Sequence, residues 1–338
     1  MGETASEPTV REGDVLAGRY RLVRLLGEGG MGAVWEARQV TTDKVVALKL
    51  LKRREASDVA RFLREARLAA ALSHRNIVQV FDYWEVEGGG PVFLVMELFE
   101  GRTLAERMEG AGPIPLDEVL SVARPVAAAL RYAHAQGVVH RDLKPENVFL
   151  ARTPDGSGAT EVKVVDFGLA RPTVPDTAAT AITQTGAIMG TPYYMAPEQV
   201  YGDKDVDGRA DVWALGAVLW ECLAGCKAFD GENFGQIFKR ISRADVRPLA
   251  EVARDVPPWL ASLVGRMLAH GREDRPTMAE VHDALSHEGA PAKEASAPPP
   301  AQAQATVRWP GPDPATPALP VATRLTATTS MRPSVPPA

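Results

Sequence analysis

One octet constrains this chain more than any other stretch, because its polar groups need partners from elsewhere before they can do chemistry. Residues 140–147 read His-Arg-Asp-Leu-Lys-Pro-Glu-Asn and lead into the apolar residues 148–150. The carboxylate of Asp142 can accept a proton from an attacking hydroxyl, and the amide oxygen of Asn147 can ligate a hard cation. Lys144 can stabilise the charge of a phosphoryl group in transfer. The octet therefore predicts a glycine loop for phosphates, a Lys–Glu pair and a second metal carboxylate, in a fixed order.

Composition excludes several classes of protein. The 338 residues are 45% hydrophobic and 24% charged, with a formal net charge of −5, which is typical of about two soluble globular domains. There is no basic excess to bind nucleic acid, no apolar run long enough to span a membrane, and no secretory signal in the polar, acidic start. Cys222 and Cys226, the two cysteines, lie in an apolar helical pattern and are predicted to be buried packing residues, which favours a reducing compartment.

Apolar periodicity predicts a β-rich first part and a helical second part. Strands are expected at residues 19–26, 33–37, 45–50, 77–84 and 92–97, with a helix from a cap at Ser57 to Leu72. Helices are expected at 103–108, 116–136, 211–224, 233–242, 259–269 and 278–285. Residues 1–17 read as a flexible leader, and the Pro/Ala/Thr-rich residues 288–338 as a disordered tail. Trp309 and residues 326–330 are docking or phosphorylation candidates, or simply solvated chain.

A glycine-rich segment lies between two predicted strands. The candidate phosphate-contacting residues are Gly27, Glu28, Gly29, Gly30 and Gly32. A dinucleotide-binding loop would open a helix instead, and the P-loop pattern G-x-x-x-x-G-K-[ST] is absent. A hairpin with bare backbone can lie over a triphosphate, although for this stretch alone an ordinary glycine-rich hairpin is the alternative.

Three more motifs follow in the predicted order. Lys49 ends Ala-Leu-Lys within an apolar strand, Asp166-Phe167-Gly168 follows another strand, and residues 190–198 read Gly-Thr-Pro-Tyr-Tyr-Met-Ala-Pro-Glu. With the octet, these motifs resemble the eukaryotic-type (Hanks-type) protein kinases, in their bacterial serine/threonine branch. The resemblance covers about residues 18–287. It implies an α+β bilobal fold, with a small lobe at about 18–100 built from a five-stranded sheet and one helix, and a larger, mainly α-helical lobe at about 101–287.

The resemblance also implies a nucleotide site. Lys49 would contact the α- and β-phosphates of ATP and pair with Glu65 on the long helix, while Glu55, which precedes that helix, is the alternative partner. Asp166 and Asn147 would hold two Mg²⁺ (or Mn²⁺) ions. The residues implied around the adenine are Val34, Ala47 and Phe149 on its faces, Met96 behind it, and the backbone of Glu97 and Phe99 at its edge.

Further residues are implied in regulation and support. Arg141 beside the base would pair with a phosphate on an activation loop, with Thr183 and Thr185 as the predicted autophosphorylation sites. Alternatively, these threonines merely suit a polar loop. The predicted structural residues are His140 (packed and hydrogen-bonded), Arg141, Phe167, Gly168, Thr191, Glu198 paired with Arg275, and Asp211 holding the catalytic-loop backbone.

The expected function is a cytoplasmic serine/threonine protein kinase that uses ATP. Its expected partners are protein substrates and a second copy of itself, either for autophosphorylation or as a transient homodimer. A pseudokinase scaffold should lack one of Lys49, Asp142, Asn147 and Asp166, and none is missing. A small-molecule phosphotransferase should lack the Ala-Pro-Glu end and the threonine-rich loop, and both are present.

Overall fold

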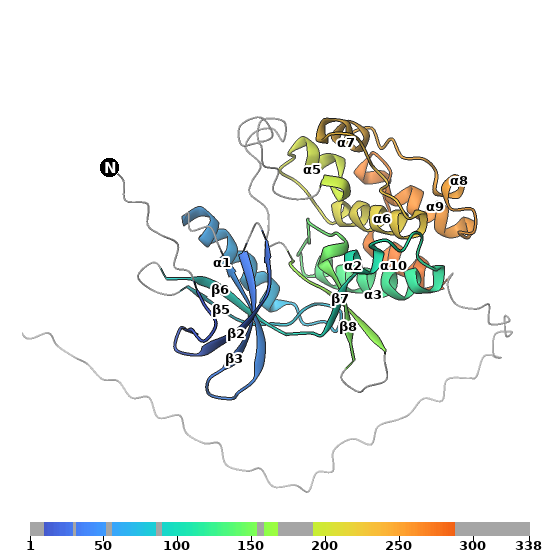
Figure 1. The fold of residues 1–338 in the computed structure, drawn as a ribbon. Coiled ribbons are helices and arrows are strands. Elements are labelled where there is room, and N and C mark those ends of the chain that lie inside the picture. The colour runs from blue at the N-terminus through green and yellow to red at the C-terminus, as the bar shows by residue number, and fades with distance from the viewer. Residues whose placement is uncertain are drawn as a thin grey trace, which may run out of the picture. The chain divides into compact units, whose positions relative to one another are not determined.

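The computed structural model describes residues 10–29, 32–51, 56–85, 90–153, 159–167 and 192–287. All of them belong to one compact unit, residues 1–291. Within this unit a β-rich lobe precedes a helical lobe along the chain (Figure 1). The predicted α+β fold with two lobes is therefore present. Among the described residues, no helix is both long and apolar enough to cross a membrane.

The first lobe is built on an antiparallel sheet of six strands in the order β1-β2-β3-β4-β6-β5. The strands are β1 (Val15–Leu16), β2 (Tyr20–Gly29), β3 (Gly32–Gln39), β4 (Val45–Leu51), β5 (Val80–Glu85) and β6 (Val92–Met96). Five were predicted. The sixth, β1, lies inside the segment predicted to be a flexible leader, so that prediction is wrong for residues 15–16. Leu16 is buried in the sheet core, and two residues are too few to display an alternating pattern.

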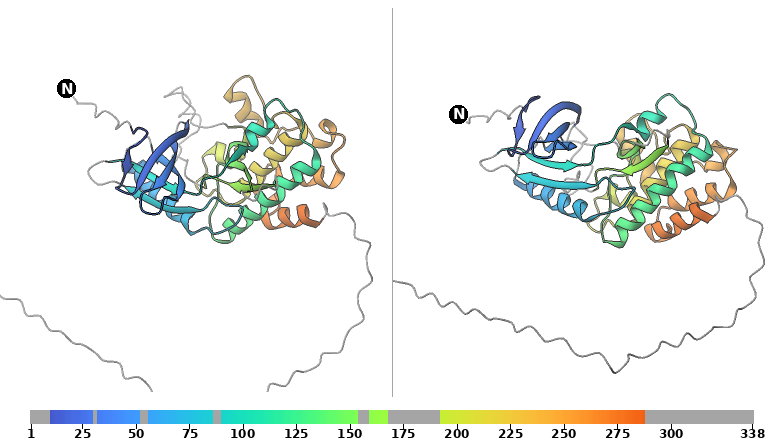
Figure 2. Two further views of the ribbon diagram at one scale, coloured as in Figure 1. Left: turned by 60° about the horizontal axis from the view of Figure 1, so that its bottom comes forward. Right: turned by 90° about the horizontal axis from the view of Figure 1, so that it is seen from below.

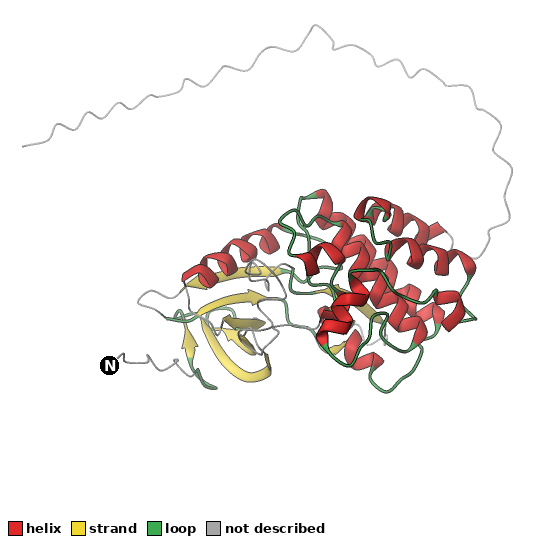
Figure 3. Cartoon of the chain, turned by 90° about the horizontal axis from the view of Figure 1, so that it is seen from above, coloured by secondary structure: helices red, strands yellow, loops and turns green. Residues whose placement is uncertain are grey.

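Helix α1 (Ala56–Ala71) covers one face of this sheet, as Figure 3 shows. Its buried residues Phe62 and Ala66 pack with Leu94, whereas Phe93 faces the cluster on the opposite side. Strand β6 is apolar throughout because successive side chains point to opposite faces and both faces are covered. The helix begins at Ala56, so the predicted cap residue Ser57 lies inside its first turn.

The second lobe is organised around α6 (Arg209–Ala224), in which every residue from Ala210 to Leu223 is buried. A helix that is apolar on all sides belongs in a protein interior, and α6 contacts α3, α9 and α10 (Figure 2). The other helices are α2 (Leu104–Met108), α3 (Leu116–Ala135), α5 (Pro197–Tyr201), α7 (Phe234–Ile241), α8 (Leu249–Val252), α9 (Pro258–Met267) and α10 (Met278–His287). The predicted helices are all present within two residues at each end, whereas the short α5 and α8 were not predicted.

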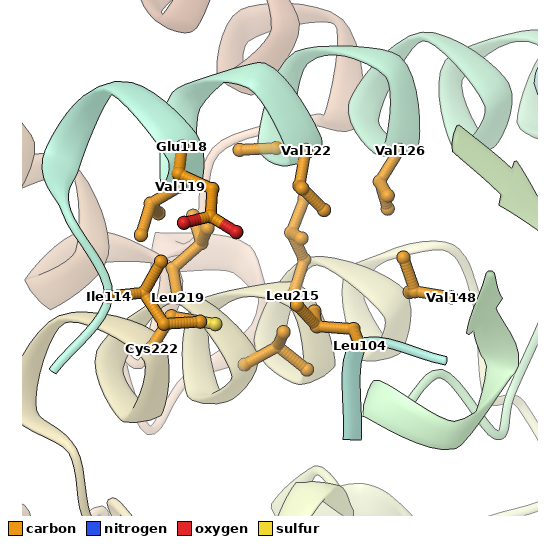
Figure 4. A pocket seen from close by; sticks show the side chains of 12 residues that line it. Leu104, Ile114, Glu118, Val119, Val122, Val126, Val148, Leu215, Leu219 and Cys222 are labelled. Atoms are coloured by element: carbon orange, nitrogen blue, oxygen red, sulfur yellow. The ribbon is translucent and has the colours of Figure 1, made fainter. Parts of the chain in front are cut away.

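Figure 4 shows side chains of α3 and α6 facing one another across a small apolar cavity. Its volume of about 10 Å³ is close to that of a single water position, so it is a packing gap rather than a ligand site. Cys222 lines the gap, with its Sγ 3.8 Å from Sδ of Met108. The prediction of a buried packing cysteine is correct for Cys222 but wrong for Cys226, which is exposed because α6 ends before it at Gly225.

A second sheet carries the residues that matter for chemistry. Its strands β7 (Gly101–Thr103), β8 (Val148–Arg152) and β9 (Thr160–Val164) are antiparallel and lie in that order. The backbone of Gly101 has φ +151°, and a Cβ there would lie 2.1 Å from the carbonyl oxygen of Leu150, so only glycine fits. The octet therefore runs between α3 and β8, and Asp166 follows β9.

A short link joins the two sheets. Residues 77–84 were predicted as one strand, but β5 begins only at Val80. Ile77 instead forms a parallel bridge with Val164 of β9, and the Val78 N–H donates to the Val164 carbonyl at 3.0 Å. The Val164 N–H in turn donates to the carbonyl of Asn76 at 2.8 Å. Strand β9 is thus bound directly to the segment that enters the first sheet.

Candidate active site

The octet folds back on itself and gathers its polar groups. Lys144 Nζ donates to Asp142 Oδ2 at 3.0 Å, and Asn147 Nδ2 donates to the backbone oxygen of Asp142 at 2.7 Å. Pro145 begins the 3₁₀ turn Pro145–Asn147, where its fixed φ suits a first helical position, and this turn brings Asn147 back to the base. A candidate base, a cation and a candidate metal ligand therefore lie within one hydrogen-bonded group.

A buried carboxylate supports this loop from behind. Asp211 is fully buried and accepts the N–H groups of His140 and Arg141, each at 2.8 Å, while His134 Nε2 lies 2.7 Å from its Oδ2. Burial by itself would raise the pKa of Asp211, but the hydrogen bond and charge of His134, with the backbone donors, hold it below its ordinary value. The predicted role of Asp211 agrees with these contacts.

Arg141 adopts a strained backbone conformation, with φ +66° in the left-handed region. Its N–H is held by Asp211, and its carbonyl oxygen accepts from Gln199 Nε2 at 2.9 Å. Sequence reasoning missed Gln199, which lies directly after Glu198 but carries no motif signal of its own. The Arg141 side chain is exposed, with one long contact of 3.4 Å from its Nη2 to the carbonyl of Val206.

His140 is packed and hydrogen-bonded, as predicted. Its Nε2 lies 2.9 Å from the carbonyl oxygen of Val165, and its ring packs on Phe167 with centroids 4.7 Å apart. The N–H of Asp142 donates to its Nδ1, so the network assigns the ring proton to Nε2. His140 thus connects the octet to the segment that carries Asp166 and has no free nitrogen for acid–base work.

Lys49, on a strand of the first sheet, and Asp166, which follows a strand of the second, come together. Lys49 lies on β4, and its Nζ is 2.7 Å from Asp166 Oδ2. Burial would raise the pKa of Asp166, but the charge and hydrogen bond of Lys49 hold it below its ordinary value, so this carboxylate stays ionised. Glu65 lies on α1, but its side chain is outside the described part of the structure, so the Lys49–Glu65 pair stays a prediction.

The glycine-rich segment forms a hairpin whose glycines have different reasons to be there. Gly27 pairs with Val34, Glu28 with Ala33, and Gly29 with Gly32 across β2 and β3. A Cβ on Gly32 would lie 1.9 Å from the carbonyl oxygen of Leu50, whereas one on Gly27 would meet nothing within 4 Å. Gly32 is therefore required by the close approach of β4, a packing reason that sequence reasoning missed. Gly30 lies outside the described residues.

The candidate adenine residues lie on both sheets. Ala47 pairs with Met96 across β4 and β6, and Val34 pairs with Lys49 across β3 and β4. Phe149 lies on β8 of the second sheet. Ala47 thus lies on the strand that carries Lys49, and Val34 and Met96 pair with that strand, whereas their place around an adenine stays a prediction.

The segment between the two sheets contributes the remaining candidates. The ring of Phe99 lies 5.9 Å from that of Phe149, centroid to centroid. The Glu97 N–H donates to the carbonyl of Gln79 at 2.9 Å, so Glu97 has its carbonyl oxygen, not its N–H, to offer a ligand. An adenine edge could then pair with the Glu97 carbonyl and the Phe99 backbone.

Asn147 and Asp166 fit a divalent cation. The amide nitrogen of Asn147 is committed to Asp142, so the amide oxygen is the atom available as a ligand, and the Val165 N–H donates to the Asn147 carbonyl at 3.0 Å. Carboxylate and amide oxygens suit a hard cation such as Mg²⁺. Two protein ligands do not fill its coordination shell, so phosphate and water oxygens would supply the rest.

Glu198 and Arg275 pair as predicted. Both Arg275 Nη atoms donate to the Glu198 carboxylate, at 2.7 and 2.9 Å, and both residues are buried. The guanidinium also donates to the carbonyl of Ala269 and lies 4.9 Å from the ring centroid of Trp213. This pair braces the core of the helical lobe. The remaining predicted residues, Gly168, Thr183, Thr185 and Thr191, lie outside the described residues.

Comparisons with known proteins agree with this geometry. The protein kinase domain family matches residues 20–288. The chain is 38% identical over 278 residues to the serine/threonine-protein kinase pkn3 of Myxococcus xanthus, covering 80% of this chain and 50% of that protein. It is 40% identical over 267 residues to the serine/threonine-protein kinase PknL of Mycobacterium tuberculosis, covering 78% and 64%.

A solved structure is also similar. The crystal structure of the Mycobacterium tuberculosis PknI kinase domain, a double mutant, superposes with a TM-score of 0.65 at 29% identity, covering 83% of this chain and 100% of that one. The chain spans about half the length of the curated relatives that it matches, 50%, 32% and 44% of three of them. This chain belongs to the protein kinase family and, within it, to the bacterial serine/threonine kinases of the eukaryotic (Hanks) type.

Proposed function

We propose that this chain transfers the γ-phosphate of ATP to serine and threonine hydroxyls of proteins. One observation carries the proposal. Asp142, Lys144 and Asn147 form a single hydrogen-bonded group, with contacts of 3.0 and 2.7 Å. His140 joins this group to the segment of Asp166, which pairs with Lys49. A base, two cations and two metal ligands are therefore available to one phosphoryl group.

Each side chain has a distinct part in this reaction. The Asp142 carboxylate orients the substrate hydroxyl and accepts its proton. Lys144 lies beside the base, where its ammonium stabilises negative charge that develops on the phosphoryl oxygens, and Lys49 aligns the α- and β-phosphates. Asn147 and Asp166 would hold a divalent cation, which would supply further positive charge to stabilise the phosphate oxygens.

Mg²⁺ is the cation that we propose. Mg²⁺ binds through one or two carboxylates plus substrate phosphates and keeps several waters, which matches a site to which the described residues contribute Asn147 and Asp166. Activity measured with Mg²⁺ and with Mn²⁺ at equal free concentrations tests this choice. Faster transfer with Mn²⁺ throughout would overturn it.

We propose that autophosphorylation of Thr183 or Thr185 activates the enzyme. The exposed Arg141 guanidinium next to the base supports this, because it can pair bidentately with a phosphate. Mass spectrometry after incubation with ATP and Mg²⁺ should find phosphate on one of these threonines. Replacing both with alanine should then lower the rate of transfer to a protein substrate.

The decisive experiment replaces Asp142 with Asn. Incubation with labelled ATP and a protein substrate should give a transfer rate lower by about 10²- to 10⁴-fold, with nucleotide binding and folding retained. The control, Asp255→Asn, changes an exposed carboxylate of the helical lobe and should transfer at the original rate. Equal rates for Asp142→Asn and the original protein would refute the proposal. If the original protein binds nucleotide but labels no protein, it is a scaffold. If it labels only an added metabolite, it is a small-molecule phosphotransferase.

We also propose a cytoplasmic location and the division of the chain into a leader that ends before β1, the kinase domain at 18–287 extended by β1 at its start, and a tail at 288–338. ATP as substrate and the exposed free thiol of Cys226 support the location, because unpaired exposed thiols suit a reducing compartment. Protein substrates, the chain itself and a transient second copy are the proposed partners. Fractionation of cells and limited proteolysis test location and division, respectively.

A further inference from the structure

Lys163 is a buried lysine that the proposed chemistry does not use. Only 7% of the residue is exposed, and it lies on β9 three positions before Asp166. Removing an ammonium from water costs free energy unless opposite charges or aromatic rings offset the loss. Its surroundings therefore indicate what the residue contributes.

The ammonium of Lys163 is shared between its own strand and residues 97–99, which follow β6. Its Nζ lies 3.6 Å from Oε2 of Glu161, two positions earlier on β9, and 3.6 Å from Oε2 of Glu97. It also lies 5.1 Å from the ring centroid of Phe99, within the range of a cation–π interaction. Glu97 and Phe99 are the two residues whose backbone is predicted to meet the adenine edge. Lys163 thus holds this segment by two side chains.

A third adenine candidate belongs to the same group. Phe149 and Lys163 are direct cross-strand partners in β8 and β9, so their side chains project to the same face of the sheet. The Phe149 ring lies 5.9 Å from that of Phe99. The three side chains therefore form a continuous series, from the Lys163 ammonium to the Phe99 ring and then to the Phe149 ring.

Contacts that do not involve the Lys163 side chain also fix its surroundings. Asn76 Nδ2 donates to the carbonyl of Val162 at 2.9 Å, Ile77 bridges to Val164, and the Glu97 N–H donates to Gln79. None of these bonds uses the side chain at position 163. We therefore expect a substitution to leave the fold intact and to loosen only the side chains of residues 97–99.

We propose that Lys163 is a positioning residue for nucleotide binding. By holding the Glu97 carboxylate and the Phe99 ring, it sets the position of residues 97–99 relative to Phe149, the residues predicted to surround the adenine. The inference rests on the proposed function, because ATP is taken as the nucleotide. Without Lys163, residues 97–99 would have to be ordered each time ATP binds, which weakens ATP binding. Within the described part of the chain, the group around Asp142 does not contact Lys163, so the rate of the chemical step should not change.

The test compares Lys163→Met, which keeps the length but not the charge, with Lys163→Arg, which keeps the charge and the cation–π contact. Lys163→Met should raise the KM for ATP by about tenfold, with kcat and the KM for the protein substrate nearly unchanged. Lys163→Arg should restore most of the ATP affinity. The control Lys239→Met, at an exposed position of α7, should match the original protein. An unchanged KM for ATP, or a parallel loss of kcat and thermal stability, would overturn the proposal.

A second pair of variants separates the two carboxylates. Glu97→Gln should raise the KM for ATP in the same direction as Lys163→Met, whereas Glu161→Gln should not. Equal effects would mean that Lys163 only neutralises charge on β9, and would overturn the positioning role. The dissociation constant of a fluorescent ATP analogue, measured without transfer, should change in parallel with the KM for ATP. If the original protein binds the analogue but transfers no phosphate, the proposed function is wrong. If Lys163→Met binds the analogue as tightly as the original protein does, the inference about Lys163 is wrong.

Discussion

The ammonium of Lys49 lies 2.7 Å from the carboxylate of Asp166, and this contact joins β4 of the first sheet to the segment that follows β9 of the second. It places a fixed positive charge next to a candidate metal ligand. Because the pKa of Asp166 lies below its ordinary value, this carboxylate is ionised at neutral pH. This ion pair is therefore a contact between the two lobes as well as part of the site.

Replacing Lys49 with Met should lower the rate of phosphoryl transfer by about 100-fold or more, because the positive charge that would contact the phosphates is lost. It should also lower the melting temperature, since Asp166 is left partly buried without its cation. Adding Asp166→Asn to this variant should restore the melting temperature but not the activity. Calorimetry and a transfer assay on the single and double variants measure both effects. Recovery of activity in the double variant would contradict the assigned roles.

The local part of the site follows from sequence spacing, and the long-range part does not. Asp142, Lys144 and Asn147 are within five positions of one another, so one proline-started turn brings them together. Glu198 and Arg275 are far apart in the chain, and nothing in their spacing requires them to meet. That pairing could be predicted only from the resemblance to a family.

Other residues could not be predicted because their reasons lie in tertiary contacts. Gly32 reads as part of a phosphate loop, but the backbone of Leu50 is what excludes a side chain there. Lys163 alternates with apolar residues in its strand and reads as solvent-facing, yet residues 97–99 cover it. Gln199 is one position beyond a motif, and its bond to Arg141 depends on a strained loop conformation. In each case a neighbouring segment, rather than the local pattern, decides the role.

Breaking the Glu198–Arg275 pair should destabilise the protein strongly. Both side chains are almost fully buried, so Arg275→Met leaves an uncompensated carboxylate, and the free energy of unfolding should fall by about 3–5 kcal/mol. Urea denaturation measures it. The control, Arg38→Ala, removes an exposed pair of 2.9 Å with Asp43 and should cost about 1 kcal/mol or less. Similar losses in the two variants would show that burial does not govern the effect.

The two cysteines should react very differently with alkylating reagents. Burial raises the pKa of the Cys222 thiol to about 12, whereas Cys226 is exposed. Because the thiolate is the reactive form, iodoacetamide at pH 8 should label Cys226 in the folded protein and Cys222 only after denaturation. Peptide mass spectrometry distinguishes the sites. Early labelling of Cys222 without loss of structure would mean that the α3–α6 interface opens readily.

Asp211 should make the stability of the fold sensitive to acid. Its pKa in the folded protein lies below the unfolded value of about 3.9, so its stabilising contribution is fully present above that value. The contribution is lost as the pH falls through the folded pKa. The difference in unfolding free energy between the original protein and Asp211→Asn should therefore shrink as the pH falls below about pH 4.

The same variant should separate stability from positioning of the catalytic loop. An asparagine keeps only one oxygen acceptor for the two N–H groups of His140 and Arg141, so the loop should loosen and kcat should fall at pH 7.5. The KM for ATP should change little, because the adenine candidates lie on other elements. Urea denaturation at several pH values and steady-state kinetics test the two parts, with Asp255→Asn as the control. If the stability difference between the original protein and Asp211→Asn persists unchanged to pH 3, the pKa of the Asp211 carboxyl is not lowered. If kcat is unchanged in the variant, Gln199 alone holds the strained backbone of Arg141.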